Sequence, residues 1–252
     1  MEIVKKGEGE PEFTVMGSIH GDEPAGKKAI EQFLEEEHDF KRPVQFVIGN
    51  EKALEDGERF IDSDLNRSFP GKPDSESYEE RLASKIIDAV EGTKLLDIHT
   101  TRSYPLPFAT CSTLNDEIWD MLASTGAKNA AYFPTEGGKL HEHVKGVVVE
   151  AGFQETDQAV ENAKGVIKNF LTLQGVIEGE ARRSDPQIFE VTGSIDGEWE
   201  FKAENFKRVE KGEVYAVNGD NGLEASESFY PVLMSTNGYD GMLGYQAQRK
   251  EI

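Results

Sequence analysis

The amino-acid sequence predicts an α/β protein in which a mixed, largely parallel sheet is flanked by helices and followed by a small C-terminal antiparallel β domain. Up to about residue 180, short apolar segments alternate with longer segments whose apolar residues recur at helical spacing. Beyond that point, short β-rich segments are separated by Gly, Asp and Asn residues. The length of 252 residues suffices to bury a core in one large domain or in two unequal ones.

The first elements follow from local patterns at the start of the chain. Residues 12–19 (EFTVMGSI) predict a strand, and a loop with the sequence HGDE follows it. Pro24 fits the first turn of the next helix, where its missing N–H is not needed. That helix continues through residues 25–37, because its apolar residues fall on one face. Residues 43–50 (PVQFVIGN) predict a second, buried strand.

The alternation continues through the middle of the chain. Residues 75–91 predict an amphipathic helix, and TKLLDIH at 93–99 predicts a strand. A further helix is expected at 114–126. The run of β-branched residues in GVVVEAG, at 146–152, indicates a central strand, and 155–175 predict the helix that follows it.

The pattern of apolar and turn residues changes after the polar segment EGEARRSDP at 178–186. The following segments are short, β-rich and separated by turn residues: QIFEVTGSI, EWEFKAE, GEVYAVN and FYPVLMS. We therefore expect an α/β domain over residues 1–179 and a small β-rich domain over 180–252.

The composition narrows the class of partner. The formal net charge is −21, and the 48 acidic residues are spread along the chain. The negative electrostatic field of such a chain disfavours binding to nucleic acid and to anionic membranes, because phosphate binding needs clustered Lys and Arg. Attraction of cationic substrates is one interpretation of the charge. We favour adaptation of the whole surface to very high salt, and hence a halophilic source, because dense salt screens the self-repulsion.

Other features of the chain predict a soluble cytoplasmic protein. The single cysteine, Cys111, excludes an intramolecular disulfide and a thiolate-rich zinc site. No apolar run approaches the roughly 20 residues that span a bilayer. The first residues, MEIVKKGEGEPEF, lack the apolar stretch of a secretory signal. The sequence leaves the oligomeric state open, including a homo-oligomer.

Three dispersed residues have the character of metal ligands. His20 and Glu23 lie three positions apart after the first strand, and His99 directly follows an apolar run. Two imidazoles, one carboxylate and an open position are typical of catalytic zinc. Glu150, at the end of a predicted strand, could act as general base. Because ligands bind beyond the carboxyl ends of strands in open α/β sheets, we expect these four residues to converge there.

Each of these signals is common on its own. A single histidine is more often a surface or core residue than a ligand, and His-x-x-Glu arises by chance. The histidine after LLDI is the rarer feature, because a buried strand end seldom carries Asp and His unless they have partners. Asp97 precedes His99 by two positions, and a nearby carboxylate is expected to orient this imidazole.

The segment RFIDSDLNRSFPG, at 59–71, suggests a substrate contact. Arg59 and Arg67 can offer bidentate recognition of a carboxylate, or stabilise an oxyanion near a metal ion. The alternative is that these arginines pair with Asp62 and Asp64 to hold a long loop in place. The sequence leaves this alternative open for one of the two.

The same segments carry a family resemblance. The sequence resembles the aspartoacylase and succinylglutamate desuccinylase family, within the zinc carboxypeptidase clan. The resemblance depends on HGDE at 20–23, RFIDSDLNRSFPG at 59–71, DIHTT at 97–101 and VEAG at 149–152, in the family's order. It covers essentially the whole chain, because the family also has a small C-terminal β domain that caps the site. It implies a zinc carboxypeptidase-like catalytic domain for residues 1–179.

The resemblance also implies a role for each matching residue. One zinc ion per chain would be bound by His20, Glu23 and His99. Glu150 would activate the attacking water and protonate the leaving amine, and Arg59 would polarise the scissile carbonyl. The implied substrate-binding residues are Asn66, Arg67 and, in the closing segment FYPVLMSTNGY, Tyr239; the alternative for Tyr239 is a place in the core of the β domain.

The sequence departs from the family pattern at one position. Aspartoacylases have an arginine about ten residues before the catalytic glutamate, and here that position falls near Leu140. Lys139 could substitute as a point charge without the bidentate geometry of arginine. We expect His141 and His143 to be surface residues rather than further zinc ligands. N-acetylaspartate is therefore not the expected substrate, and an N-acyl amino acid or similar amide with one carboxylate is.

Two other functions compete with a zinc-dependent amidohydrolase. A metallocarboxypeptidase acting on short peptides would share the zinc chemistry, but a capping domain narrows access for longer chains. A non-catalytic metal-binding protein of the same fold would need neither Glu150 nor Arg59.

Overall fold

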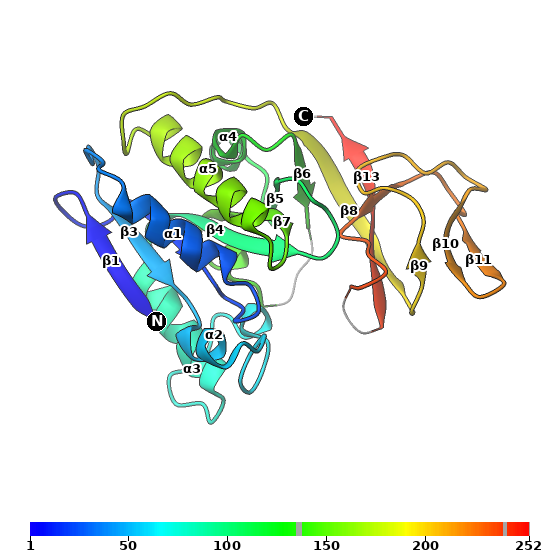
Figure 1. Ribbon diagram of the computed structural model, residues 1–252, viewed down its shortest axis with the longest axis horizontal. Coiled ribbons are helices and arrows are strands. Elements are labelled where there is room, and N and C mark those ends of the chain that lie inside the picture. The colour runs from blue at the N-terminus through cyan, green and yellow to red at the C-terminus, as the bar shows by residue number, and fades with distance from the viewer. Residues whose placement is uncertain (135–137, 239–240, 252) are drawn as a thin grey trace.

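Figure 1 shows the computed structural model, which describes residues 1–134, 138–238 and 241–251. Among these residues, ten strands form one sheet in the order β1-β3-β2-β4-β7-β5-β6-β8-β13-β12. In chain order they are β1 (Glu2–Lys6), β2 (Phe13–Gly17), β3 (Val44–Ile48), β4 (Lys94–Thr101), β5 (Phe108–Cys111), β6 (Asn129–Tyr132), β7 (Gly146–Phe153), β8 (Gln187–Asp196), β12 (Tyr230–Val232) and β13 (Met242–Lys250).

The centre of this sheet is parallel. Strands β3, β2, β4 and β7 are neighbours and run in one direction, so their carboxyl ends meet at one edge. The pairs β5–β6 and β6–β8 are also parallel. Strand β1 pairs antiparallel with β3, β5 with β7, and β13 with β8 and β12. The predicted mixed, largely parallel sheet is confirmed.

Helices cover both faces of the sheet. Helices α1 (Ala25–Glu35), α4 (Asp116–Thr125) and α5 (Asp157–Leu173) pack on one face, and α1 and α5 cross the near side of the sheet in Figure 1. Helix α3 (Tyr78–Val90) packs on the other. The smaller elements are α2 (Glu51–Asp56) and two 3-10 helices, η1 (Leu65–Arg67) and η2 (Leu140–Glu142).

The alternation of side chains along each strand divides the core in two. In β7, Val147 and Val149 face the cluster under α1, α4 and α5. In β4, Leu96 and Ile98 belong to that same cluster, while Leu95 contacts α3 on the opposite face. Because successive strand residues point to opposite faces, His99 and Glu150 lie on the α3 side. The α3 side of the carboxyl edge is therefore where polar side chains can gather.

The C-terminal part adds a small antiparallel sheet. Strands β9 (Glu200–Phe201), β10 (Val214–Asn218) and β11 (Asn221–Glu224) pair in the order β11-β10-β9 and lie at the far end of the molecule from β1 (Figure 1). A separate apolar cluster that includes Tyr215 and Phe229 packs beside them. Strand β8 extends the main sheet beside β6, so hydrogen bonding continues across the expected boundary at 178–186. The division at residue 180 stays a prediction.

Within the described part of the chain, no helix combines the length and the apolar character needed to cross a membrane.

Candidate active site

The loop between β2 and α1 carries His20 and Glu23. Glycines let this loop lie close to its neighbours: a Cβ on Gly17 would be 2.8 Å from the backbone of Gly26, and one on Gly21 would be 2.1 Å from the backbone of Ala53. The N–H of Gly21 also donates to the carbonyl of Arg59 at 3.1 Å. The close approach fixes the loop over the carboxyl edge of the sheet.

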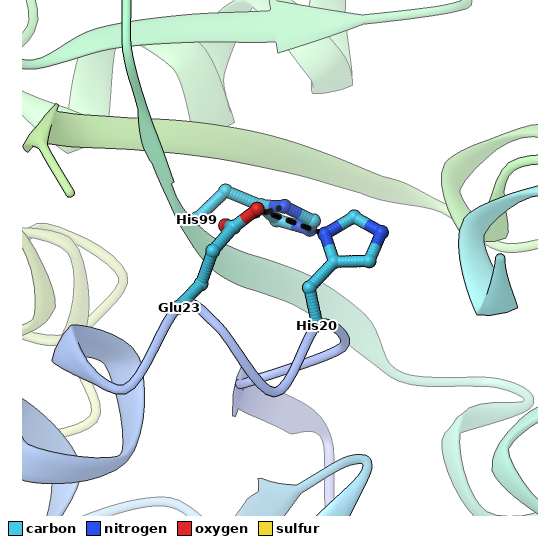
Figure 2. A group of neighbouring side chains, drawn as sticks. All are labelled: His20, Glu23 and His99. Atoms are coloured by element: carbon cyan, nitrogen blue, oxygen red, sulfur yellow. Dashed lines mark hydrogen bonds and ion pairs between the residues drawn. The ribbon is translucent and has the colours of Figure 1, made fainter. Parts of the chain in front are cut away.

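His20, Glu23 and His99 form a buried cluster of metal-ligand type. One ligand atom from each lies within 4.8 Å of the others, and Figure 2 shows the three side chains pointing toward one another. Nδ1 of His20 is 2.9 Å from Oε1 of Glu23, and Nδ1 of His99 is 3.3 Å from Oε2. The three side chains are at most 5% exposed. The expected convergence of these residues is confirmed.

Both imidazoles have a carboxylate partner on their second nitrogen. Nε2 of His20 lies 3.0 Å from Oδ1 of Asp64, and Nε2 of His99 lies 3.0 Å from Oδ2 of Asp97. Such partners fix the orientation and tautomer of metal-binding imidazoles. The contact expected between His99 and a nearby carboxylate is confirmed. The donor set and its outer partners therefore fit a divalent ion with an open coordination position.

The electrostatics of the cluster also favour a cation. Burial alone would raise the pKa of Glu23, but the two adjacent imidazoles hold this pKa well below its usual value. Burial lowers the pKa of His20 and His99, yet the carboxylates around them raise both above their usual value. Glu23 thus stays anionic, and binding a metal ion would displace protons from the imidazoles.

Glu150 lies beside this cluster on the neighbouring strand. It is the register partner of His99 in the parallel β4–β7 pair. Its Oε2 is buried and accepts no hydrogen bond within residues 1–134, 138–238 and 241–251. Burial raises the pKa of Glu150 to about 8, and the charge of Glu23 adds to this, against the opposing effect of His99. A carboxyl group of this kind can both accept and donate a proton near neutral pH.

This raised pKa predicts a pH-dependent stability difference in metal-free protein. The folded chain retains a proton on Glu150 that the unfolded chain loses near its usual pKa of 4.5. The resulting stabilisation is complete below that pH and is lost as the pH rises through about 8. We expect metal-free Glu150→Gln to match the wild-type Tm at pH 4 and to exceed it at pH 9. Calorimetry of both proteins after removal of metal with a chelator checks this. A Tm difference between variant and wild type that is the same at pH 4 and pH 9 would contradict it.

Arg59 contacts the cluster directly. Its Nη1 is 3.1 Å from Oε1 of Glu23, and its Nη2 is 3.3 Å from Oδ2 of Asp64. The sequence also allowed an ion pair between Arg59 and Asp64, and the structure confirms this ion pair. The same arginine also lines the pocket described below.

Asn66 and Arg67 lie in η1, which begins after Asp64. Oδ1 of Asn66 accepts the N–H of Leu140 at 3.3 Å, so the amide nitrogen is the end of Asn66 that can donate to a ligand. Nη1 of Arg67 donates to the carbonyl of Asn66 at 2.7 Å. Both side chains line the same pocket as Arg59.

A buried carboxylate in α3 holds the loop that carries these residues. The carboxyl oxygens of Glu79 accept the backbone N–H groups of Ile61, Asp62 and Ser63 at 2.7–3.2 Å, and also the side chain of Asn50. The sequence did not reveal this role, because Glu79 resembles an ordinary first-turn helix residue. The sequence feature that could have indicated this role is the position of Glu79 on the apolar side of the helix.

A pocket opens from the cluster toward the C-terminal strands. Its empty space is about 870 Å³, which includes open solvent at its mouth. The C-terminal part contributes to its wall through Leu233, Ser235, Gly238, Met242, Leu243 and Tyr245. Its charged lining is mainly cationic, from Arg59, Arg67, Arg102 and Lys139, and Glu150 is the one carboxylate in the described lining. Cationic side chains therefore outnumber carboxylates in the described lining of this pocket, although the chain as a whole is strongly negative.

The sequence matches a known family over this region. Residues 10–161 match the model for the succinylglutamate desuccinylase/aspartoacylase catalytic domain. The chain belongs to the succinylglutamate desuccinylase and aspartoacylase family. The match includes the loop with His20 and Glu23, both arginines of the 59–71 segment, His99 and Glu150.

Family members with curated names are similar to parts of the chain. It is 35% identical to a probable aspartoacylase of Prochlorococcus marinus over 100 residues, which cover 34% of the chain and 33% of that protein. It is 29% identical to the N-alpha-acetyl-L-2,4-diaminobutyric acid deacetylase of Halomonas elongata over 219 residues, or 74% of the chain and 61% of the relative. The chain thus spans between a third and three fifths of the length of these relatives.

A solved structure has the same fold as this chain. An ectoine utilization protein from Ruegeria pomeroyi superposes with a TM-score of 0.77 at 20% identity, over 98% of the chain and 87% of that protein. Such coverage extends the shared fold beyond residue 161, through the C-terminal strands. The resemblance stated from the sequence is confirmed as to family and fold.

The expectation for the two histidines before β7 needs a correction. His143 is exposed, as expected. His141 is not a surface residue: it is only 6% exposed and lines the pocket. A pattern of two histidines in a polar segment does not reveal that η2 turns one of them inward. The remaining expected site residue, Tyr239, lies outside the described residues.

Proposed function

We propose that this protein is a zinc-dependent deacylase that hydrolyses the amide bond of small N-acylated amino acids. The observation that carries the proposal is the His20–Glu23–His99 cluster at the inner end of a pocket that also contains Glu150. Bound by these three residues, a zinc ion would supply Lewis acidity for water activation and carbonyl polarisation. The family membership of the chain supports this chemistry.

Glu150 would carry the proton through the reaction. As a carboxylate it accepts a proton from the attacking water, and as a carboxylic acid it donates that proton to the amine nitrogen as the C–N bond breaks. Its position beside His99 and the raised pKa of its buried carboxyl group support both roles. The products are a carboxylic acid and a free amino group.

The arginines and Asn66 would provide charge complementarity. Arg59, in contact with the ligand Glu23, would stabilise the negative oxygen that develops on the scissile carbonyl. Asn66 and Arg67 would bind the carboxylate of the amino-acid part. The mainly cationic lining of the pocket supports an anionic substrate, and it disfavours the interpretation of the net charge as a means to attract cationic substrates.

The roles of the two domains, the substrate and the location of the protein are also proposals. Residues 1–179 would be the catalytic part and 180–252 the part that caps the site, which the pocket residues between Leu233 and Tyr245 support. Related proteins are named for deacetylation of diaminobutyric acid and desuccinylation of succinylglutamate. We infer an N-acetyl or N-succinyl amino acid as substrate, and a cytoplasmic, salt-adapted protein.

A substrate panel tests the proposed function. The zinc-loaded protein would be assayed with N-acetyl and N-succinyl amino acids and with short peptides, and its metal content measured in parallel. Hydrolysis of N-acyl amino acids together with about one zinc ion per chain is the expected result. Preferential cleavage of C-terminal residues from peptides would favour a metallocarboxypeptidase. Metal binding without any hydrolysis would favour a non-catalytic metal-binding protein.

Removal of the carboxylate anchor should mainly weaken substrate binding. We expect Arg67→Ala to raise KM about 10- to 100-fold and to change kcat much less, because a lost charge-assisted hydrogen bond affects ground state and transition state alike. Steady-state kinetics on the best substrate of the panel measure both constants. Arg208→Ala, which removes an exposed arginine paired with Glu210, is the control. A fall in kcat with unchanged KM would instead give Arg67 a transition-state role.

A further inference from the structure

His141 is a buried histidine whose ring has no hydrogen-bond partner in the part of the protein that the structure describes. The residue is 6% exposed and lines the pocket. Both ring nitrogens are buried, and neither has a partner within the described residues. An unpaired buried polar group costs on the order of 1–3 kcal/mol, so buried polar atoms without partners call for an explanation. A ligand in the pocket that pairs with the ring provides one.

The backbone around His141 is held on several sides. Oδ1 of Asn66 accepts the N–H of Leu140, and the carboxylate of Glu142 accepts the N–H groups of Gly138 and Lys139. The carbonyl of His141 itself accepts the hydroxyl of Ser112 at 2.9 Å. These bonds fix η2 on the wall of the pocket, so the ring is a preorganised part of that wall.

The hydrogen bond to Asn66 also identifies which part of a substrate would reach His141. Asn66 and Arg67 are the proposed anchor of the amino-acid carboxylate. Leu140, which precedes His141, is bonded to this Asn66, and a Cβ on Gly138 would be 2.5 Å from the carbonyl of Arg67. The segment that carries His141 is therefore packed against the carboxylate anchor, which places the ring on the amino-acid side of the substrate.

The ring of His141 is neutral at physiological pH. Burial lowers its pKa to about 3, and the nearby charges of Lys139, His99 and Arg67 act in the same direction. A neutral imidazole offers one N–H donor and one nitrogen acceptor. A primary amide or hydroxyl can pair with either of these nitrogens, by accepting from the N–H or by donating to the bare nitrogen, whereas a carboxylate can only accept from the N–H.

We propose that His141 determines substrate specificity by hydrogen bonding to an uncharged polar group, a primary amide or hydroxyl, in the side chain of the substrate's amino acid. This inference rests on the proposed function, because that function supplies the orientation of the substrate. Lys139 is the competing determinant. Its Nζ lies 4.4 Å from the centroid of the Phe133 ring, in a cation–π contact, and it would favour a side-chain carboxylate instead.

Ratios of kcat/KM test the inference on the zinc-loaded full chain. The substrates are N-acetylglutamine, N-acetylglutamate and N-acetylmethionine, which have similar size but differ in side-chain chemistry. We expect the glutamine derivative to be preferred over the methionine derivative at least about tenfold. His141→Phe should bring this ratio close to one, and His141→Arg should shift the preference toward N-acetylglutamate. His143→Phe, at an exposed histidine two residues away, should leave the ratios unchanged.

A binding measurement keeps the inference testable if a His141 variant fails to fold. In the non-hydrolysing variant Glu150→Gln, ¹⁵N NMR of labelled histidines should show His141 ring signals that shift with N-acetylglutamine and stay in place with N-acetylmethionine. Equal kcat/KM for the two compounds in the wild type, or ring signals that do not respond, would overturn the inference. Absence of hydrolysis of every N-acyl amino acid, with the ring shift retained, would overturn the proposed deacylase function alone.

Discussion

Glu150→Gln is expected to lower kcat about 10²- to 10⁴-fold while the protein still binds about one zinc ion per chain. The substitution keeps the size of the side chain and its place opposite His99 in the β4–β7 register, but glutamine can neither accept the proton of the attacking water nor pass it to the amine. The measurement is steady-state kinetics on the best N-acyl amino acid, with metal content determined on the same preparation.

The value of this variant lies in separating proton transfer from metal binding. Glu150 is not one of the three cluster residues, so its replacement should leave the ligand set complete. KM should change little. If Glu150→Gln retained most of the wild-type kcat, another group would have to move the proton and the base assignment would be wrong.

His99→Ala is expected to abolish both metal binding and hydrolysis. The substitution removes one of three protein ligands and leaves the buried carboxylate of Asp97 without its partner, 3.0 Å away. Because the loss of an outer-shell partner alone typically weakens metal binding about 10- to 100-fold, the loss of a ligand should exceed about 100-fold. Equilibrium dialysis against zinc, followed by metal analysis, measures the change.

A second pocket histidine provides the matched control. His141 is buried in the same pocket, but it does not belong to the His20–Glu23–His99 group. His141→Ala should therefore retain wild-type zinc content. Full zinc retention by His99→Ala would contradict the ligand set, and zinc loss by His141→Ala would extend that set.

Buried apolar strands and amphipathic helices of this chain could be predicted, and short elements without an apolar pattern could not. The predicted helices and strands up to residue 175 correspond to α1, α3, α4, α5, β2, β3, β4 and β7 in the structure. Strand β1 (EIVKK) and helix α2 (EKALED) are not predicted, because most of their residues are charged, whereas the equally short β2 and β3 are apolar and fully buried. Strands β5 and β6 have four residues each, and pairing with longer neighbours stabilises them.

The residues of the candidate site also divide into those that the sequence could predict and those that it could not. His20, Glu23 and His99 were predictable because each lies at or just beyond the carboxyl end of a recognisable strand, and the carboxyl ends of parallel neighbours converge. The outer partner Asp64 and the inward direction of His141 were not. Both depend on the path of irregular loops, which is set by distant contacts such as the hydrogen bond between Asn66 and Leu140.

The pairing of β8 with β6 has a consequence for substrate entry. The strand that leads into the C-terminal part, β8, is hydrogen bonded along Asn129–Tyr132 of β6, with four register pairs. A rigid-body movement of the C-terminal part away from the rest of the chain would break the hydrogen bonds between β6 and β8. The loss of these bonds would make such a movement rare. Substrates and products should therefore pass through the mouth of the pocket, while its two walls stay joined throughout turnover.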